Sequence, residues 1–150
     1  MSVLKRWLVS GAGADAKAGA VVVAAAGGDA IGAAPGRHAE DRALAHLQAH
    51  GLVLVERNYR VARGPHRRGG EIDLVMRDAQ GTLVFVEVRS RRNAAHGGAA
   101  ASVGAAKRAS LVYAAQHYLL RWRSPPPCRF DLIAIDAGEL RWLPAAFDAG

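Results

Sequence analysis

Two strand-forming segments joined by a short turn constrain this chain more than any other feature. Residues 71–76 alternate between polar and apolar side chains, and residues 82–89 hold the strongest run of β-branched and aliphatic residues in the sequence. Asp78-Ala79-Gln80-Gly81 lies between them and is typical of a turn. We therefore predict that the two segments pair as an antiparallel hairpin.

Further elements are predicted on both sides of this hairpin. The helices are expected at residues 37–50 and 102–122, and the other strands at residues 52–60, 130–135 and 140–143. Gly51 follows the first helix as a C-terminal stop, and Ser102 is placed to cap the second helix. The order α-β-β-β-α-β-(β) predicts an α/β protein whose mixed sheet is flanked by helices.

The length of 150 residues suits one domain with a tail. Residues 1–34 are dominated by Ala and Gly without a lasting period, so we expect a disordered tail there and one folded domain over residues 35–150. Cys128 is the single cysteine, which excludes an intrachain disulfide framework and favours a cytoplasmic location. The longest near-apolar run, residues 18–28, is shorter than the ~20 residues that span a bilayer, so no membrane span is expected.

The charge balance predicts an anionic partner. Lys plus Arg number 20 against 13 Asp plus Glu, a formal net charge of +7. A basic domain of this size favours nucleic acid first and an acidic membrane second. Two runs of cations border the hairpin, and the candidate phosphate-binding residues in them are Arg57, Arg60, Arg67, Arg68, Arg91, Arg92 and Lys107. The alternative for these runs is an ordinary solvated face.

Two acids, Asp73 and Glu87, lie among the aliphatic residues of the hairpin. If paired residue numbers sum to 160, Asp73 lies opposite Glu87. In the same register Glu71 lies opposite Arg89. Directly opposed side chains have Cβ atoms ~4.5–5.5 Å apart, so the two carboxylates repel each other and a divalent cation would compensate. A register shifted by one residue would instead place the acids on opposite faces, each in a surface ion pair.

A third acid, Glu40, falls on the apolar face of the first predicted helix, in line with Leu44 and Leu47. A carboxylate on that face needs a partner, because an unpaired buried charge is costly. The alternative is a place at the rim of the helix, where Glu40 pairs with an Arg.

Several short motifs occur in the order and spacing of a known family. They are Gly36-x-x-x-Glu40, His50-Gly51-Leu52, Arg57-Asn58-Tyr59-Arg60, Gly70 to Val75, Val84 to Arg89 and Arg129-Phe130-Asp131. Together they resemble the YraN-type family over roughly residues 36–143. That family is placed with restriction-endonuclease-like and Holliday-junction-resolvase-like folds, so the resemblance implies a restriction-endonuclease-like sheet here.

The resemblance also implies a PD-(D/E)xK-type site that acts on DNA phosphodiesters with Mg²⁺ or Mn²⁺. Glu40, Asp73 and Glu87 would hold the metal, and Arg89 completes the catalytic set where the family pattern has lysine. Arg keeps its charge at any accessible pH and is a poor general base. The implied function is a metal-dependent nuclease-like protein, with branched or damaged DNA as candidate substrates and a dimer as a candidate assembly. The alternative is a non-catalytic nucleic-acid-binding module that retains the acid cluster.

Overall fold

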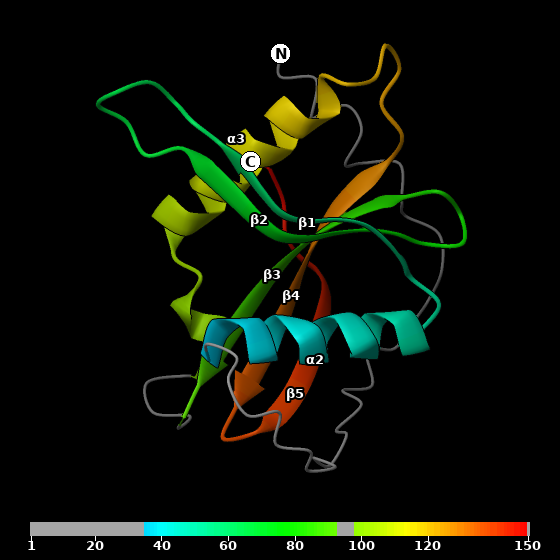
Figure 1. Cartoon of the computed structure of the whole chain (residues 1–150), viewed down its shortest axis with the longest axis vertical. Coiled ribbons are helices and arrows are strands. Elements are labelled where there is room, and N and C mark those ends of the chain that lie inside the picture. The colour runs from blue at the N-terminus through cyan, green and yellow to red at the C-terminus, as the bar shows by residue number, and fades with distance from the viewer. Residues whose placement is uncertain (1–34, 93–97, 150) are drawn as a thin grey trace.

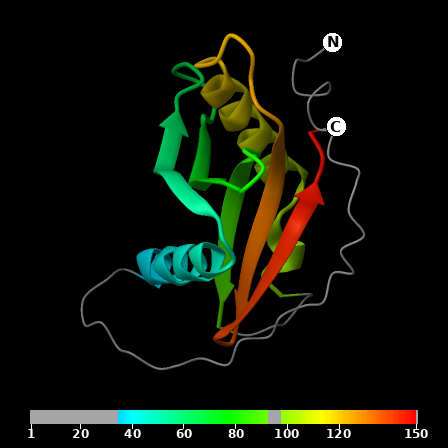
Figure 2. The same cartoon turned by 90° about the vertical axis from the view of Figure 1, so that its right-hand side faces the viewer.

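A five-stranded mixed sheet has one helix packed on each face (Figures 1 and 2). This computed structural model describes residues 35–92 and 98–149. Its elements are α2 (Pro35–Ala49), β1 (Val53–Val61), β2 (Gly70–Arg77), β3 (Leu83–Arg91), the 3₁₀ helix η2 (Ala100–Ser102), α3 (Ala105–Leu119), β4 (Cys128–Asp136) and β5 (Glu139–Phe147). This order confirms the predicted α/β class. The predicted tail, residues 1–34, lies outside the described residues. Within the described ranges, none of the helices is long and apolar enough to cross a membrane.

The strands are arranged in the sheet in their chain order, from β1 at one edge to β5 at the other. β3 and β4 are parallel, whereas all other neighbours are antiparallel. Parallel neighbours need a crossover connection, and the segment that contains α3 provides it. The crossover places α3 against the face of the sheet opposite to α2.

The β2–β3 hairpin has the predicted register. Its pairs run from Leu74 opposite Val86 to Arg77 opposite Leu83, so the residue numbers of each pair sum to 160. The register that would have separated the acids onto opposite faces is therefore not the one the chain adopts.

Alternating side chains of the strands build two apolar clusters, one on each face of the sheet. Val84 and Val86 of β3 belong to the cluster that contains α2, whereas Leu83 and Phe85 belong to the cluster that contains α3. Tyr118 of α3 packs edge-on against Phe85, with ring centroids 5.8 Å apart. Burial of each such side chain stabilises the fold by about 1.5–3 kcal/mol. The clusters thus fix both helices relative to β3.

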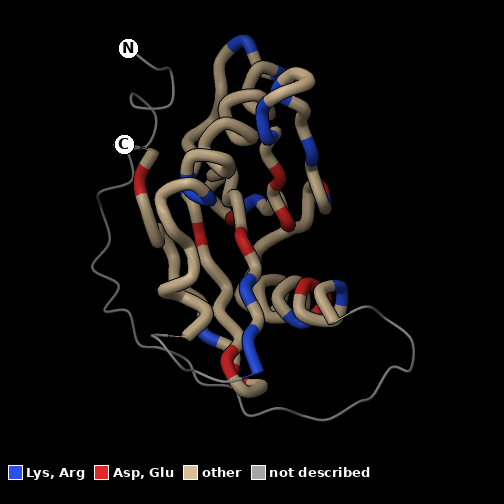
Figure 3. The backbone as a smooth tube through the Cα atoms, turned by 90° about the vertical axis from the view of Figure 1, so that its left-hand side faces the viewer, with Lys and Arg blue, Asp and Glu red and all other residues tan. Residues whose placement is uncertain are grey.

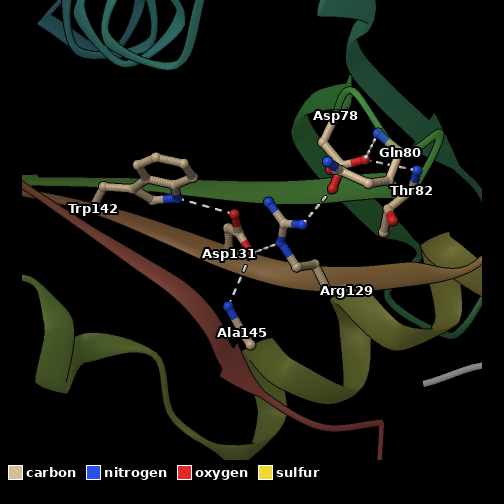
Figure 4. A network of polar contacts seen from close by, with 7 residues as sticks. All are labelled: Asp78, Gln80, Thr82, Arg129, Asp131, Trp142 and Ala145. Atoms are coloured by element: carbon tan, nitrogen blue, oxygen red, sulfur yellow. Dashed lines mark hydrogen bonds and ion pairs between the residues drawn. The ribbon is translucent and has the colours of Figure 1, made fainter. Parts of the chain in front are cut away.

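A buried acid joins β4 to β5 and to the hairpin turn (Figure 4). Asp131 Oδ1 accepts hydrogen bonds of 3.0 Å from Arg129 Nε and from the backbone N–H of Ala145. Asp131 Oδ2 accepts one of 3.0 Å from Trp142 Nε1. Arg129 Nη1 also donates to Asp78 Oδ2 at 2.8 Å, and Asp78 in turn accepts backbone hydrogen bonds within the turn. Both oxygens of Asp131 therefore have partners.

Ser102 does not cap α3, contrary to the prediction. Its Oγ donates to the carbonyl oxygen of Ala99 at 2.6 Å, so Ser102 ends η2 instead. Gly104 is the N-cap residue of α3 and provides no side-chain hydrogen bond. The first turn of α3 therefore begins without a capping oxygen, which leaves its N–H groups available to another acceptor.

Candidate functional site

The acids of the hairpin lie where β2 separates from β3. The ladder between these strands ends at Leu74 opposite Val86, whereas β2 continues along β1 to Gly70. β3 continues along β4 to Arg91. In Figure 1 the β1–β2 hairpin accordingly turns away from β3 toward the upper left, over α3, while β3 runs on toward the lower left. Asp73 is the first residue of β2 beyond the shared ladder.

A backbone irregularity at this fork redirects Asp73. Regular alternation would place Ile72 and Leu74 on one face, yet Ile72 belongs to the α3-side cluster and Leu74 to the α2-side cluster. On β1, Asn58 stands at the corresponding position with φ of 52°, a left-handed conformation that Asn tolerates better than most residues. Asp73 Oδ2 accepts a hydrogen bond from the backbone N–H of Val88 at 2.8 Å. The carboxylate thus bridges the gap between the two strands.

Glu87 is the most buried acid of the fork, with 3% of its side chain exposed. Its Oε1 lies 3.0 Å from Arg89 Nε, and its Oε2 lies 3.1 Å from Lys107 Nζ in the first turn of α3. These contacts are ion pairs without hydrogen-bond geometry, because neither Glu87 Oε2 nor Arg89 Nε has a hydrogen-bond partner among the described residues. The charge of Glu87 is therefore compensated by two cations, but its Oε2 receives no hydrogen bond from the described residues.

The two acids perturb each other. Burial raises the pKa of Asp73, although the Val88 N–H and the charge of Lys107 oppose that rise. Burial, followed by the charge of Asp73, raises the pKa of Glu87 to about 7, against the opposing charges of Lys107 and Arg89. At neutral pH this pair therefore attracts either a proton or a cation.

Glu40 approaches the fork from α2 but is held by other residues. Its Oε2 accepts a hydrogen bond from Asn58 Nδ2 at 3.2 Å and lies 3.5 Å from Arg57 Nη2. Arg57 Nη2 also contacts Asp41 Oδ1 at 2.8 Å. The charge of Glu40 still contributes to the raised pKa of Asp73. The ion pair anticipated as the alternative for Glu40 is thus present, and its role as a metal ligand stays a prediction.

The expected three-acid metal set is not assembled in this conformation. Among residues 35–92 and 98–149, no group of three or more His, Cys, Asp or Glu side chains is placed to hold a metal ion. The physical reason is that Arg57 and Asn58 bind the Glu40 carboxylate on the α2 side. What the structure brings together is the pair Asp73 and Glu87.

The expectation that Arg89 lies opposite Glu71 is wrong. Glu71 Oε1 pairs with Arg60 Nη2 at 2.8 Å, whereas Arg89 contacts Glu87 on its own strand. The register that relates these positions ends at Leu74, before β2 reaches Glu71. Arg89 therefore compensates the charge of Glu87 rather than that of Glu71.

The sequence comparisons assign a family to this chain. The model of the Uncharacterised protein family UPF0102 matches residues 39–135, from α2 to β4. The chain belongs to this family. A UPF0102 protein of Paracidovorax citrulli is 66% identical over 117 residues, which cover 78% of this chain and 84% of that protein. A UPF0102 protein of Methylibium petroleiphilum is 64% identical over 116 residues, 77% of this chain and 95% of that protein. The resemblance to the YraN-type family is thereby confirmed.

In this UPF0102 protein, cations lie on both sides of the acid pair. A hollow of about 1200 Å³ on the α3 side is lined by four of the predicted phosphate-binding cations, namely Arg60, Arg67, Arg68 and Lys107, together with Arg89. A second hollow of about 690 Å³ contains Arg89, Arg91 and Arg92 together with Glu40 and Asp73. In Figure 3, positions of Lys and Arg lie along the backbone above and below a central group of Asp and Glu positions. Arg57, also predicted to bind phosphate, is instead engaged by α2.

The β1–β2 loop, residues 62–69, is attached to α3 near both of its ends. Tyr113 Oη donates to the carbonyl oxygen of Ala62 at 3.2 Å, and Ser110 Oγ donates to that of Gly69 at 3.1 Å. Gly70 allows the close approach, since an added Cβ would lie 2.6 Å from the Ser110 carbonyl oxygen. These contacts position α3, and with it Lys107, relative to β2.

Sequence reasoning missed two features of the site. Asn58 enters the predictions only as part of a family motif, although an Asn inside a strand pattern is a signal for a left-handed backbone position. Lys107 was expected to face phosphate, and its contact with Glu87 depends on how α3 packs against β3, which no local pattern specifies.

Proposed function

We propose that this protein is a metal-dependent nuclease that acts on DNA phosphodiesters in the cytoplasm. The observation that supports it best is the pair of buried Glu87 and half-buried Asp73 at the fork, flanked on both sides by hollows lined with cations. A polyanionic backbone that follows the cations from one hollow to the other would pass Arg89, which lines both hollows, and Asp73, which lines the smaller one. Local negative charge at that point repels a phosphate unless a cation is bound between them.

The acid pair fits a hard divalent cation. Mg²⁺ is commonly bound through one or two carboxylates, with water and phosphate oxygens completing its coordination. Glu87 Oε2 is buried and has no hydrogen-bond partner among the described residues, and burial together with the charge of Asp73 raises the pKa of Glu87. Asp73 and Glu87 would hold the ion, either Mg²⁺ or Mn²⁺. When bound, such an ion stabilises charge on a phosphate and lowers the pKa of a coordinated water.

The remaining residues bind and orient the substrate. Arg89 lines both hollows, so its permanently charged guanidinium is placed to contact a phosphate beside the acids. Arg67 and Arg68 are exposed and would contact the backbone farther along the larger hollow. Contacts of this kind position a nucleic acid without selecting its sequence.

Two observations favour a second candidate, a nucleic-acid-binding module that does not cleave. Arg89 occupies the place where the family pattern has lysine and cannot act as a general base near neutral pH. Glu40 is bound by Arg57 and Asn58 rather than joined to the acid pair. Both features leave phosphate binding intact while weakening the case for catalysis.

Cleavage and binding assays on the same proteins separate these candidates. Branched and linear DNA are incubated with the parent, Glu87→Gln and Arg89→Lys proteins in Mg²⁺, in Mn²⁺ and in EDTA. A nuclease cuts only with metal, loses cutting in Glu87→Gln while still binding DNA, and retains or gains activity in Arg89→Lys. Equal cutting by the parent and Glu87→Gln indicates a contaminant. Salt-dependent DNA binding without cutting by any of the three identifies the binding module.

A further inference from the structure

Lys107 stands at an electrostatically unusual place. It is the third residue of α3, close to the positive end of the helix dipole, where cations are normally disfavoured. The first turn of α3 contains no acid, and the N-cap residue Gly104 offers no side-chain oxygen. The nearby compensation comes from another element, since Lys107 Nζ lies 3.1 Å from Glu87 Oε2.

Lys107 and Arg89 both contact Glu87, one of the two acids that would hold a metal ion. Each contacts one oxygen of the Glu87 carboxylate, at 3.1 and 3.0 Å. Their two positive charges replace, in this conformation, the charge that a divalent cation would supply. A metal ion that takes Glu87 Oε2 must therefore compete with the ammonium group.

The displaced ammonium group has a place to go. Lys107 is 26% exposed and lines the larger hollow beside Arg60, Arg67 and Arg68. A lysine stem has four rotatable carbons, so its ammonium can exchange partners without a movement of the helix. Inside that hollow, a phosphate would meet Lys107 and the uncapped first turn of α3 together.

We propose that Lys107 is an internal counter-ion that competes with the divalent cation for Glu87 and, once displaced, binds a phosphate of the nucleic acid in the larger hollow. This inference rests on the proposed function, because it assumes a metal at Asp73 and Glu87. Metal binding and DNA binding then favour each other, and by linkage the effect is reciprocal. Without DNA the site holds its own cation; with DNA it accepts the metal.

The first test measures Mg²⁺ binding by calorimetry without DNA, at pH 8 so that proton competition is small. The proteins are the full-length parent, Lys107→Met and Arg108→Met. Arg108 is a matched control, since it is an exposed cation one residue farther along α3. Removal of the competing ammonium should tighten Mg²⁺ binding roughly fivefold in Lys107→Met, the equivalent of one partly exposed ion pair. Arg108→Met should stay within about twofold of the parent.

The second test measures the salt dependence of binding to a cleavage-resistant phosphorothioate DNA, in EDTA and in Mg²⁺. In the parent, Mg²⁺ should release Lys107 and steepen the log–log slope by about 0.7–0.9, the value for one added phosphate contact. In Lys107→Met the slope should be the same in both conditions. Lys107→Gln repeats both measurements if the Met protein does not fold.

The possible results distinguish the inference from the function on which it rests. If the parent binds Mg²⁺ and DNA but Lys107→Met binds Mg²⁺ no more tightly than the parent, the counter-ion role is overturned and the nuclease proposal stands. If none of the proteins binds Mg²⁺, both are overturned. Equal tightening in Lys107→Met and Arg108→Met also overturns the inference, because it shows a general charge effect.

Discussion

Asp131 and Glu87 are acids in neighbouring parallel strands, and they show two ways to bury a carboxylate. Asp131 pairs across the ladder with Val86, the residue before Glu87. Asp131 receives hydrogen bonds on both oxygens and ties β5 to β4 (Figure 4). Glu87 faces two cations and a second acid, has a raised pKa, and one of its oxygens receives no hydrogen bond from the part of the chain that the structure describes.

The difference indicates which acid is available for chemistry. A carboxylate whose two oxygens both accept hydrogen bonds is satisfied within the fold, and it contributes to stability. A carboxylate held by charge alone costs stability unless a ligand binds it. On this basis Asp131 belongs to the scaffold and Glu87 to the site, although both interrupt aliphatic strands.

The largest effect is expected at Asp131. Asp131→Ala removes the acceptor of three hydrogen bonds and leaves Arg129 paired only with Asp78, so the free energy of unfolding should fall by about 3–5 kcal/mol. Urea unfolding measures this loss. Asp148→Ala, which removes an exposed acid, should change stability by less than about 0.5 kcal/mol. A loss at Asp131 no greater than at Asp148 would contradict the scaffold role.

Replacement of Glu87 should raise the free energy of unfolding, whereas replacement of Asp131 should lower it. The pKa of Glu87 is raised in the folded state, so the folded protein favours the protonated acid. The stability that this acid contributes is therefore full below about pH 4.5 and is lost as the pH rises through about 7. Glu87→Gln, which resembles the protonated acid, should therefore stabilise the metal-free protein at pH 8, by up to about 3 kcal/mol. The gain should vanish near pH 4.5. Urea unfolding in EDTA at both pH values tests this, and a destabilised Glu87→Gln protein at pH 8 would refute it.

A smaller effect on stability is expected at Asn58, the left-handed backbone position beside the site. Asn58 adopts a left-handed conformation and donates to Glu40, so Asn58→Ala adds backbone strain and removes a hydrogen bond. Asn58→Gly removes the same hydrogen bond without the strain. The Ala protein should be less stable than the Gly protein by about 1 kcal/mol, again measured by urea unfolding. Equal stability of the two proteins would argue that the backbone conformation at Asn58 costs nothing.

The smallest effect on stability, but a clear one on binding, is expected in the loop. Arg67→Ala combined with Arg68→Ala removes two exposed cations, so the unfolding free energy should change by less than about 0.5 kcal/mol. The salt dependence of DNA binding, expected to have a log–log slope of roughly −4 to −5 for about five phosphate contacts, should flatten by about 2. Fluorescence anisotropy at several salt concentrations measures it. An unchanged slope would remove this loop from the interface.

Local patterns were sufficient for much of this structure. The element order and the register of the β2–β3 hairpin followed from the alternation of side chains and a short turn. The predicted register placed Asp73 near Glu87, and this was sufficient because each acid lies one residue beyond the last pair of the β2–β3 ladder, Leu74 and Val86. The family resemblance added Glu40, which lies close enough to affect the pKa of Asp73.

The rest depended on departures from those patterns. The backbone irregularity at Asn58 and Asp73 interrupts the alternation of side chains between the two sheet faces on β1 and β2. A β2–β3 register extended to Glu71 therefore does not hold. The contact of Lys107 with Glu87 depends on the packing of α3 against β2 and β3, including the close approach at Gly70. Interactions between segments so distant in the chain leave no local signal.

The attachment of the β1–β2 loop to α3 has a thermodynamic consequence. Because Ala62 and Gly69 accept hydrogen bonds from Tyr113 and Ser110, the segment between them is restricted near both ends before any ligand arrives. Part of the conformational entropy of ordering Arg67 and Arg68 is therefore lost during folding rather than during association. The loop is preorganised: its attachment would act on affinity through entropy, while the number of phosphate contacts stays the same.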